Sequence, residues 1–216
     1  MLAIIRVFTT TNQQILESHG KIIEKLYDIS VKNYCILDQP YGIHDSTTEQ
    51  MAIPKIITVA RQAGKDGADA ILISCAADPA LEEVRAAVRL PVLGAGTCAA
   101  AMSMAFGQRV GVLNLSGKTP LSPAAVLGSR LEMELAPEGV ENTTDLLTSK
   151  GKASATRALQ RLAAKCDVVM LACTGFSTIG FAEKMRQQVD VPLVDAIEAA
   201  GAAAQLLFLQ KKFKKM

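Results

Sequence analysis

The sequence predicts an α/β protein made of two pseudo-symmetric halves, each a three-layer α/β/α arrangement around a mainly parallel sheet. The first observation is the alternation of short apolar segments with segments of helical periodicity along the chain, a pattern typical of parallel sheets connected by helices. The second is an internal repeat. Residues 70–76 form an apolar stretch that reaches a cysteine and is followed by a helical segment, and residues 168–174 begin the same series again. A repeat this long indicates two similar halves rather than a solenoid.

Composition limits the classes of function. The chain has 216 residues, of which 50% are hydrophobic, enough to bury one large core or two small ones. The net charge of +2, the few aromatic residues and the absence of tryptophan argue against a nucleic-acid partner. No apolar run approaches the roughly 20 residues that a membrane-spanning helix needs. We therefore expect neither nucleic acid nor membrane as a partner.

The five cysteines are widely spaced and odd in number, which indicates free thiols in a reducing compartment. Residues 1–8 are apolar but interrupted by Arg6, and we interpret them as a first strand rather than a secretory leader. We therefore expect a cytoplasmic protein. We also expect a homo-oligomer that acts on a small molecule.

The first half is expected to begin with a strand over residues 2–9 and a helix whose apolar stripe runs through residues 15–26. Asn12 stands where this helix needs an N-cap. His19 lies on the apolar stripe, so we expect it in the core or at its boundary. A second strand is expected over residues 31–37.

A polar loop with turn residues follows this strand, and it makes His44 a candidate neighbour of a site. The capping-box pattern from Ser46 to Glu49 is expected to open a helix that runs to about Ala63. After the first cysteine strand, Asp78 and Pro79 are expected to be the N-cap and first position of the next helix.

The second half repeats the alternation of helices and strands. The expected elements are a helix over 97–106, a strand over 109–115, a helix starting at Ser122–Pro123, a helix over 154–165, a strand over 168–172, a loop over 175–180 that enters a helix ending near Gln188, and a last helix over 196–208. Lysines at the end of the last helix complement its dipole, so the basic tail needs no nucleic acid to explain it.

Motifs that would bind a cofactor or a metal are incomplete. Residues 94–99 approximate a dinucleotide-binding fingerprint, but no acidic residue ends the next strand, where Asn114 stands. Residues 117–119 resemble the end of a phosphate-binding loop, but the earlier glycine of that motif is replaced by Val112. The sequence also lacks paired cysteines and a His-x-x-x-His pattern. We expect no cofactor and no metal.

Cys75 and Cys173 are the candidate catalytic residues. A single free cysteine is more often a small buried hydrophobic residue, and we interpret Cys35, Cys98 and Cys166 in that way. Cys75 and Cys173 differ because each follows an apolar strand and precedes a turn into a helix, in equivalent places of the repeat. Amide dipoles at such a turn favour the thiolate form.

Two thiols that face one cleft between the halves suit a racemase. One thiolate can remove a proton from a stereocentre on one face, while the opposite thiol returns a proton on the other face. The backbone amides that follow each cysteine, together with the Thr174 hydroxyl, would stabilise the developing enolate.

The residues around both cysteines resemble a known family. Residues 74–81 resemble the Cys-x-x-Asp-Pro-x-Leu motif of the hydantoin racemases, and residues 172–176 resemble their Cys-Ala-Gly-Met motif. The chain is thus similar to the aspartate/glutamate/hydantoin racemase superfamily. The resemblance implies a cofactor-independent enzyme with one catalytic cysteine in each α/β half. It also implies that the last helix completes the first half, giving domains of residues 1–95 with 196–216, and 96–195.

Two segments depart from the hydantoin racemase pattern. The Asn-Pro-Asn loop of that family is replaced by residues 9–12, which retain only Asn12, and residues 114–116 stand where the family has threonines. The substrate is therefore left open between a hydantoin and an amino acid, and the enantiomer that each cysteine serves is left open as well. The expected substrate-binding residues are Asn12, Ala76, Ala77, Asn114, Ser116, Thr174 and Gly175.

Two other functions are compatible with the sequence. One is a maleate-isomerase-like or arylmalonate-decarboxylase-like enzyme of the same superfamily. Those decarboxylases use only the second cysteine, so Cys75 argues against them, whereas the isomerases can keep both. The other is a non-catalytic small-molecule-binding protein, which would not need a thiol at both strand ends.

Overall fold

The computed structural model describes residues 1–43 and 45–214, and of residues 211–214 it describes the backbone alone. The chain divides into two compact units, Met1–Ala95 with the carboxyl-terminal segment from Ala200, and Gly96–Ala199. The first unit is therefore discontinuous in sequence, whereas the second is continuous. The sequence places the same two limits after residues 95 and 195. His44 lies outside the described residues.

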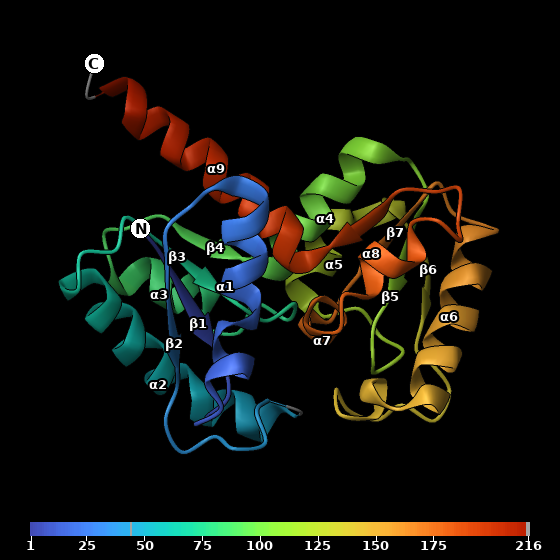
Figure 1. Ribbon diagram of the computed structural model, residues 1–216, viewed down its shortest axis with the longest axis horizontal. Helices are drawn as coiled ribbons and strands as arrows, with labels where there is room; N and C mark the ends of the chain where they lie inside the picture. Colours follow the sequence, from blue (N-terminus) through green and yellow to red (C-terminus); the bar gives the residue numbers. More distant parts are fainter. Residues whose placement is uncertain (44, 215–216) are drawn as a thin grey trace. The chain divides into compact units, whose positions relative to one another are not determined.

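The first unit is built on a parallel four-stranded sheet in the order β2-β1-β3-β4 (Figure 1). Its elements are β1 (Leu2–Arg6), α1 (Gln13–Tyr27), β2 (Val31–Cys35), α2 (Ser46–Lys65), β3 (Ala70–Ile73), α3 (Leu81–Ala87), β4 (Val92–Gly94) and most of α9 (Ala196–Lys214). Ile5 pairs with Ile73, so Arg6 at the end of β1 is level with Ser74 just after β3. The carboxyl ends of the strands thus share one edge of the sheet, where α/β proteins bind ligands.

Side chains of the central strands alternate between the two faces of this sheet. Ile5, Ile71 and Ile73 pack against apolar residues of α2 and α3 on one face. Ile4 and Leu72 are fully buried on the other face, which α1 covers. Helices on both faces give the three layers that the sequence predicts.

The second unit has the same topology, with a parallel sheet in the order β6-β5-β7-β8. Its elements are α4 (Ala95–Phe106), β5 (Val110–Leu113), α5 (Leu121–Leu127), η1 (Gly128–Arg130), β6 (Leu131–Leu135), η2 (Asp145–Leu147), α6 (Ser149–Ala163), β7 (Val168–Leu171), α7 (Thr174–Thr178), α8 (Phe181–Met185), β8 (Leu193–Asp195) and the first turn of α9. Leu159, Leu171 and Phe176 lie in its core. The predicted fold class, two α/β halves with parallel sheets, is confirmed.

Two expected helix starts are wrong. The helix after Cys75 begins at Leu81, because Asp78 and Ala80 both adopt positive φ angles and cannot belong to its first turn. The N-cap of α2 is Asp45 rather than Ser46. The Asp45 carboxylate accepts the Thr48 N–H at 2.7 Å, and the Thr48 hydroxyl accepts the Asp45 N–H at 3.1 Å. This capping box lies one residue before the one read from the sequence.

Three elements of the second half differ from expectation. The segment 175–180, expected as a loop, is mostly the short helix α7, which begins directly after Cys173. Gly180, with a φ of 61°, then separates α7 from α8. β6 was not expected, because Glu132 and Glu134 interrupt its apolar residues on this partly exposed edge strand. The last helix, α9, continues through the basic tail to Lys214.

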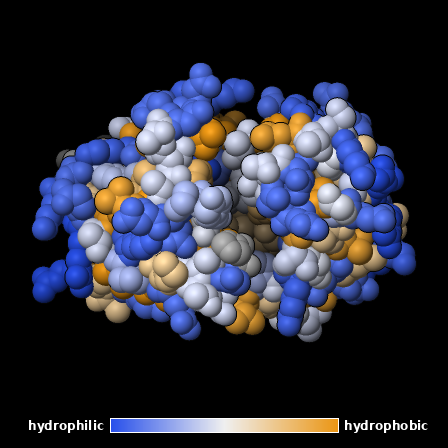
Figure 2. Space-filling view, turned by 90° about the horizontal axis from the view of Figure 1, so that it is seen from below, coloured by the Kyte–Doolittle hydropathy of each residue, from blue (hydrophilic) through white to orange (hydrophobic). Residues whose placement is uncertain are grey.

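The surface shown in Figure 2 is largely hydrophilic, with hydrophobic residues in small separate patches. Among the residues that the structure describes, no helix is both long enough and apolar enough to cross a bilayer. Within the same residues, no three His, Cys, Asp or Glu side chains are grouped so that they could hold a metal ion.

Candidate active site

Cys75 and Cys173 occupy equivalent places in the two units. Cys75 lies two residues after β3 and Cys173 two residues after β7, and each of these strands is third in a sheet of the same order. Both cysteines are free and partly buried. Each therefore lies at the edge of its own sheet where the parallel strands end, the usual position of a ligand site.

Cys173 is the N-cap of α7, and its sulfur accepts the Gly175 N–H at 3.4 Å. Burial raises the pKa of the Cys173 thiol to about 11. The amides of Gly175 and Phe176 act in the opposite direction and lower it, while the carboxylate of Asp195 raises it further. Because desolvation is the largest of these effects, the thiol form is favoured at neutral pH. Cys173 is thus suited to donate a proton.

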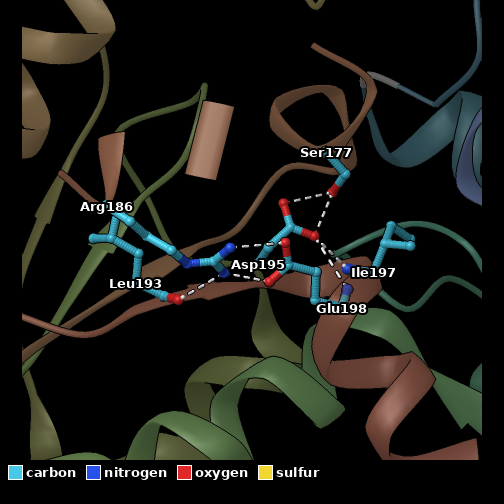
Figure 3. Close-up of polar contacts among 6 residues, drawn as sticks. All are labelled: Ser177, Arg186, Leu193, Asp195, Ile197 and Glu198. Carbon is cyan, nitrogen blue, oxygen red and sulfur yellow. Dashed lines mark hydrogen bonds and ion pairs between the residues drawn. The ribbon is translucent and has the colours of Figure 1, made fainter. Parts of the chain in front are cut away.

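Asp195 ends β8 and is buried, with 2% of its surface exposed. Both of its carboxylate oxygens accept the Ser177 hydroxyl at 2.8 Å, and the carboxylate also accepts the N–H groups of Ile197 and Glu198 at 2.9 and 3.2 Å (Figure 3). Arg186 forms an ion pair with Glu198 in the same group. Burial raises the pKa of Asp195. Asp195 therefore ties α7, which carries the amides that face Cys173, to the start of α9.

The surroundings of Cys75 in the first unit are different in charge. The preceding residue, Ser74, has its hydroxyl oxygen 2.7 Å from Nδ1 of His19, which is fully buried in α1 as its place on the apolar stripe predicts. Arg6, across the sheet from Ser74, is also buried, with 5% of its surface exposed. Cys75 and Cys35 both interact electrostatically with the Arg6 guanidinium.

Asp78 follows Cys75 and carries a buried carboxylate toward the end of β4. A Cβ atom built on Gly94, the last residue of β4, would lie 2.5 Å from Cγ of Asp78 and 2.6 Å from both carboxylate oxygens. Gly94 and Asp195 are equivalent, since each ends the fourth strand of its sheet directly before a helix. Both units therefore hold a carboxylate at the same place, but the first takes it from the loop after the cysteine and the second from the strand.

The sequence matches the Asp/Glu/hydantoin racemase family over residues 29–204, which is most of the chain. The chain belongs to this family. A hydantoin racemase of Rhizobium meliloti is 24% identical over 177 residues, covering 79% of this chain and 73% of that protein. The structure of an allantoin racemase from Pseudomonas fluorescens matches with a TM-score of 0.81 at 18% identity, covering 97% of this chain and 91% of that one. An arylmalonate decarboxylase structure matches with a TM-score of 0.67 at 16% identity, covering 96% and 92%.

These matches confirm the resemblance read from the two cysteine motifs, and they place the chain in a family of isomerases, the racemases. The structures confirm the fold, since two parallel four-stranded sheets flanked by helices are shared with them.

Three residues expected to bind substrate lie near Cys173 in this racemase-family fold. Thr174 and Gly175 form the first turn of α7. Asn114 directly follows β5, which pairs with β7, and is buried with 2% of its surface exposed. Its carbonyl oxygen accepts the Gly117 N–H at 2.6 Å, while its amide nitrogen has no partner among the described residues. An unpaired buried donor at this edge indicates a ligand position.

The other expected binding residues are more varied. Ser116 is exposed, and its hydroxyl donates to the Lys118 carbonyl at 2.9 Å. In the first unit, Ala76 is buried and Ala77 partly buried beside Cys75, whereas Asn12 is exposed and caps α1 by accepting the Ile15 N–H at 3.2 Å. A binding role for these residues stays a prediction.

Sequence reasoning missed Thr143. A Cβ built on Gly175 would lie 2.7 Å from Cγ2 of Thr143 and 3.3 Å from the sulfur of Cys173, so the exposed Thr143 borders the Cys173 site. An isolated threonine in a polar loop gives no signal of this placement. It also missed Arg6 and Asp195, and Arg6 did carry a signal as the one charge in an apolar strand.

Proposed function

We propose that this chain is a cofactor-independent racemase in which Cys75 and Cys173 form a two-base pair. The single observation that carries the proposal is the equivalent position of the two thiols, each two residues beyond the third strand of a sheet of the same order. A binding protein or a one-base enzyme requires only one of these thiols, whereas a two-base racemase requires both.

The proposed reaction takes place at a carbon next to a carbonyl group. One thiolate removes the proton from one face of this carbon, and the thiol on the other side returns a proton to the opposite face. Each sulfur must come within about 3–3.5 Å of the carbon, so the two sulfurs would face one cleft and be too far apart for a disulfide.

The intermediate is an enolate, and its negative oxygen needs hydrogen-bond donors. Around Cys173, the described donors are the amides at the start of α7, the Thr174 hydroxyl and the amide nitrogen of Asn114. The buried Asn114 nitrogen is the best suited of these, because it already lacks a partner and is held in place through its other oxygen.

The substrate class that we propose is a hydantoin or an amino acid. A hydantoin ring carries carbonyl oxygens on both sides of its ring nitrogen, so it can accept a hydrogen bond from Asn114 while its stereocentre lies between the thiols. The match to a hydantoin racemase, at 24% identity, supports this class. A small-molecule substrate, a homo-oligomeric state and a cytoplasmic location also stay predictions.

A decarboxylase related to the arylmalonate decarboxylases is the alternative, because such an enzyme shares the fold. The observation against it is again Cys75, which a decarboxylase using only the second cysteine does not need. A screen by polarimetry over 5-substituted hydantoins and amino acids, with carbon dioxide release measured in parallel on malonates, separates the two activities.

The decisive test is replacement of each thiol. Cys75→Ala and Cys173→Ala should each reduce racemisation by at least about 10²–10⁴-fold, because a proton donor or acceptor is lost on one face. Each variant should still exchange the α-proton of one enantiomer with D₂O, and the two variants should prefer opposite enantiomers. NMR of the α-proton on each pure enantiomer measures both effects.

Cys166→Ala is the matched control, because Cys166 is buried in the second unit before β7 and away from the edge where the strands end. It should racemise at the parental rate. If either Cys75→Ala or Cys173→Ala kept near-parental racemisation, a single-base mechanism would replace the proposal.

A further inference from the structure

We infer that Arg6 is a positioning residue that holds Cys75 in its thiolate form, so that the resting enzyme contains a Cys75 thiolate and a Cys173 thiol. This rests on the proposed two-base function for its catalytic meaning. The protonation states themselves can be measured without turnover.

Arg6 is fixed at the carboxyl edge of the first sheet. It ends β1, level with Ser74 on β3, and its Nη1 donates to the Ile15 carbonyl at 2.7 Å and to the Ser18 hydroxyl at 3.1 Å. Its guanidinium carbon lies 5.0 Å from the centre of the Phe8 ring. These contacts hold the cation inside the unit, where it cannot extend into water.

The charge of Arg6 requires a counter-charge. Burial lowers the pKa of Arg6 to about 10, so the guanidinium is still protonated at neutral pH, and the Cys75 and Cys35 thiols act to raise that pKa. Among the side chains of residues 1–43 and 45–210, no carboxylate forms an ion pair with it. A buried charge that lacks a partner is strongly unfavourable. A neighbouring thiolate would neutralise it.

Of the two thiols, Cys75 is the one free to ionise. The sulfur of Cys35 donates a hydrogen bond to the Thr10 carbonyl at 3.7 Å, and this contact requires its proton. Cys75 lies beyond the end of β3, at the edge where the proposed substrate binds.

The other groups around Cys75 include two titratable ones. His19 on α1 is held through Ser74, and the Asp78 carboxylate is directed to Gly94. The helices α2 and α3 present apolar side chains, Ile56 and Val84 among them, to this sheet. Arg6 is thus the cation next to Cys75 within the described side chains.

Cys173 has the opposite environment. Its neighbouring charge is the Asp195 carboxylate, which favours the thiol, and its burial acts in the same direction. In one turnover, Cys75 would take the substrate proton and become a thiol, while Cys173 would give its proton and become a thiolate. Electrons and protons balance, and transfer of one proton through solvent restores the resting pair.

The test is alkylation by iodoacetamide as a function of pH, with the modification of each cysteine read from its own peptide by mass spectrometry. In the parental protein, Cys75 should react at neutral pH at least about 10-fold faster than Cys173, and with a lower midpoint. Arg6→Met should raise the Cys75 midpoint by about one pH unit or more, the effect of losing an opposite charge, and so slow its alkylation about 10-fold. Arg6→Lys should restore the midpoint.

Arg109→Met is the control, because Arg109 is exposed in the other unit and pairs with Asp167. It should leave both midpoints unchanged. A Cys173 midpoint below that of Cys75, or an unchanged Cys75 midpoint in Arg6→Met, would overturn the inference. If Arg6→Met does not fold, the comparison of the two thiols in the parental protein still decides. Absence of racemase activity, with these midpoints as expected, would contradict the proposed function alone.

Discussion

Cys173 and Asp195 are two acids buried side by side at the ends of β7 and β8, and each makes ionisation of the other less favourable. A protein that needed only a rigid core here would use apolar side chains, because burying two acids costs stability. The Ser177 hydroxyl and the first amides of α9 satisfy the carboxylate of Asp195. Ionisation of Cys173 should consequently be visible in the stability of the whole chain.

The pKa of Cys173 rises from the ordinary 9.0 to about 11 in the folded state. Because the folded chain then binds this proton more tightly than the unfolded chain, the contribution to stability is fully present below pH 9 and is lost as the pH rises through about 11. Between about pH 8 and pH 11 the parental protein should lose roughly 2 kcal/mol more of its free energy of unfolding than Cys173→Ala. Urea denaturation at each pH measures this, and equal losses would contradict it.

Asn114 offers a second prediction at this scale. Asn114→Asp keeps the oxygen that accepts the Gly117 N–H but removes the unpaired nitrogen donor. If that donor stabilises the enolate, kcat should fall by about 10²–10³-fold, the usual effect of removing one such donor. Asn33→Asp, the same change on the edge strand β2 of the first unit, should leave kcat near the parental value. Loss of activity in both variants would point to folding rather than catalysis.

The residues that the sequence could supply are those that the repeat duplicates. Cys75 and Cys173 stand out because the same strand ending occurs twice, whereas Arg6 and Asp195 have no counterpart of the same type in the other half. A charge at a strand end is ordinarily solvated, so the sequence alone does not distinguish a buried Arg6 from an exposed one. Their roles depend on burial, which only the packing of α1 and α7 determines.

At the scale of elements, the place where β4 meets α4 is set by the contact between Asp78 and Gly94. The loop after Cys75 adopts two positive φ angles, at Asp78 and Ala80, to carry the carboxylate to this place. That conformation, and not a weak propensity, delays the start of α3. A sequence pattern of Asp-Pro predicts an N-cap because it considers only the local chain, and here a contact with a different strand overrides the local preference.

Gly94→Ala tests this contact. The new methyl group would lie 2.5 Å from Cγ of Asp78, so the loop after Cys75 must shift. Overpacking of this kind should lower the free energy of unfolding by about 1–3 kcal/mol and reduce activity through displacement of Cys75. Gly64→Ala is the matched control, because its methyl group would meet Leu90 at an ordinary 3.6 Å inside helix α2. It should be stabilising by up to about 1 kcal/mol. Urea midpoints of the two variants should therefore move in opposite directions.

At the scale of the whole molecule, the two units differ in how the chain assembles them. The second unit is a continuous segment, Gly96–Ala199, and its core residues, from Leu113 to Leu193, all lie within it. The first unit needs α9 from the far end of the chain. A Cβ on Gly201 would lie 2.4 Å from Cε2 of Tyr27, which shows how closely α9 packs on α1.

A fragment of residues 96–199 should therefore fold alone, whereas a fragment of residues 1–95 should not, because it leaves the α9-facing side of α1 uncovered. Far-UV circular dichroism during urea denaturation should show a cooperative transition for the first fragment and none for the second. Adding residues 200–216 to the second fragment through a flexible linker should restore cooperativity. A cooperative transition for residues 1–95 alone would show that α9 is dispensable for this unit.

The shared carboxylate position has a consequence for how such a protein can evolve. Asp78 and Asp195 reach the same place from different directions, and Gly94 is the residue that makes room for the first arrangement. A lineage that exchanged one arrangement for the other would need two substitutions, since either one alone leaves the place with two carboxylates or with none. Positions 78 and 94 should consequently covary among relatives, and each single change should be harmful in a background where the pair of changes is tolerated.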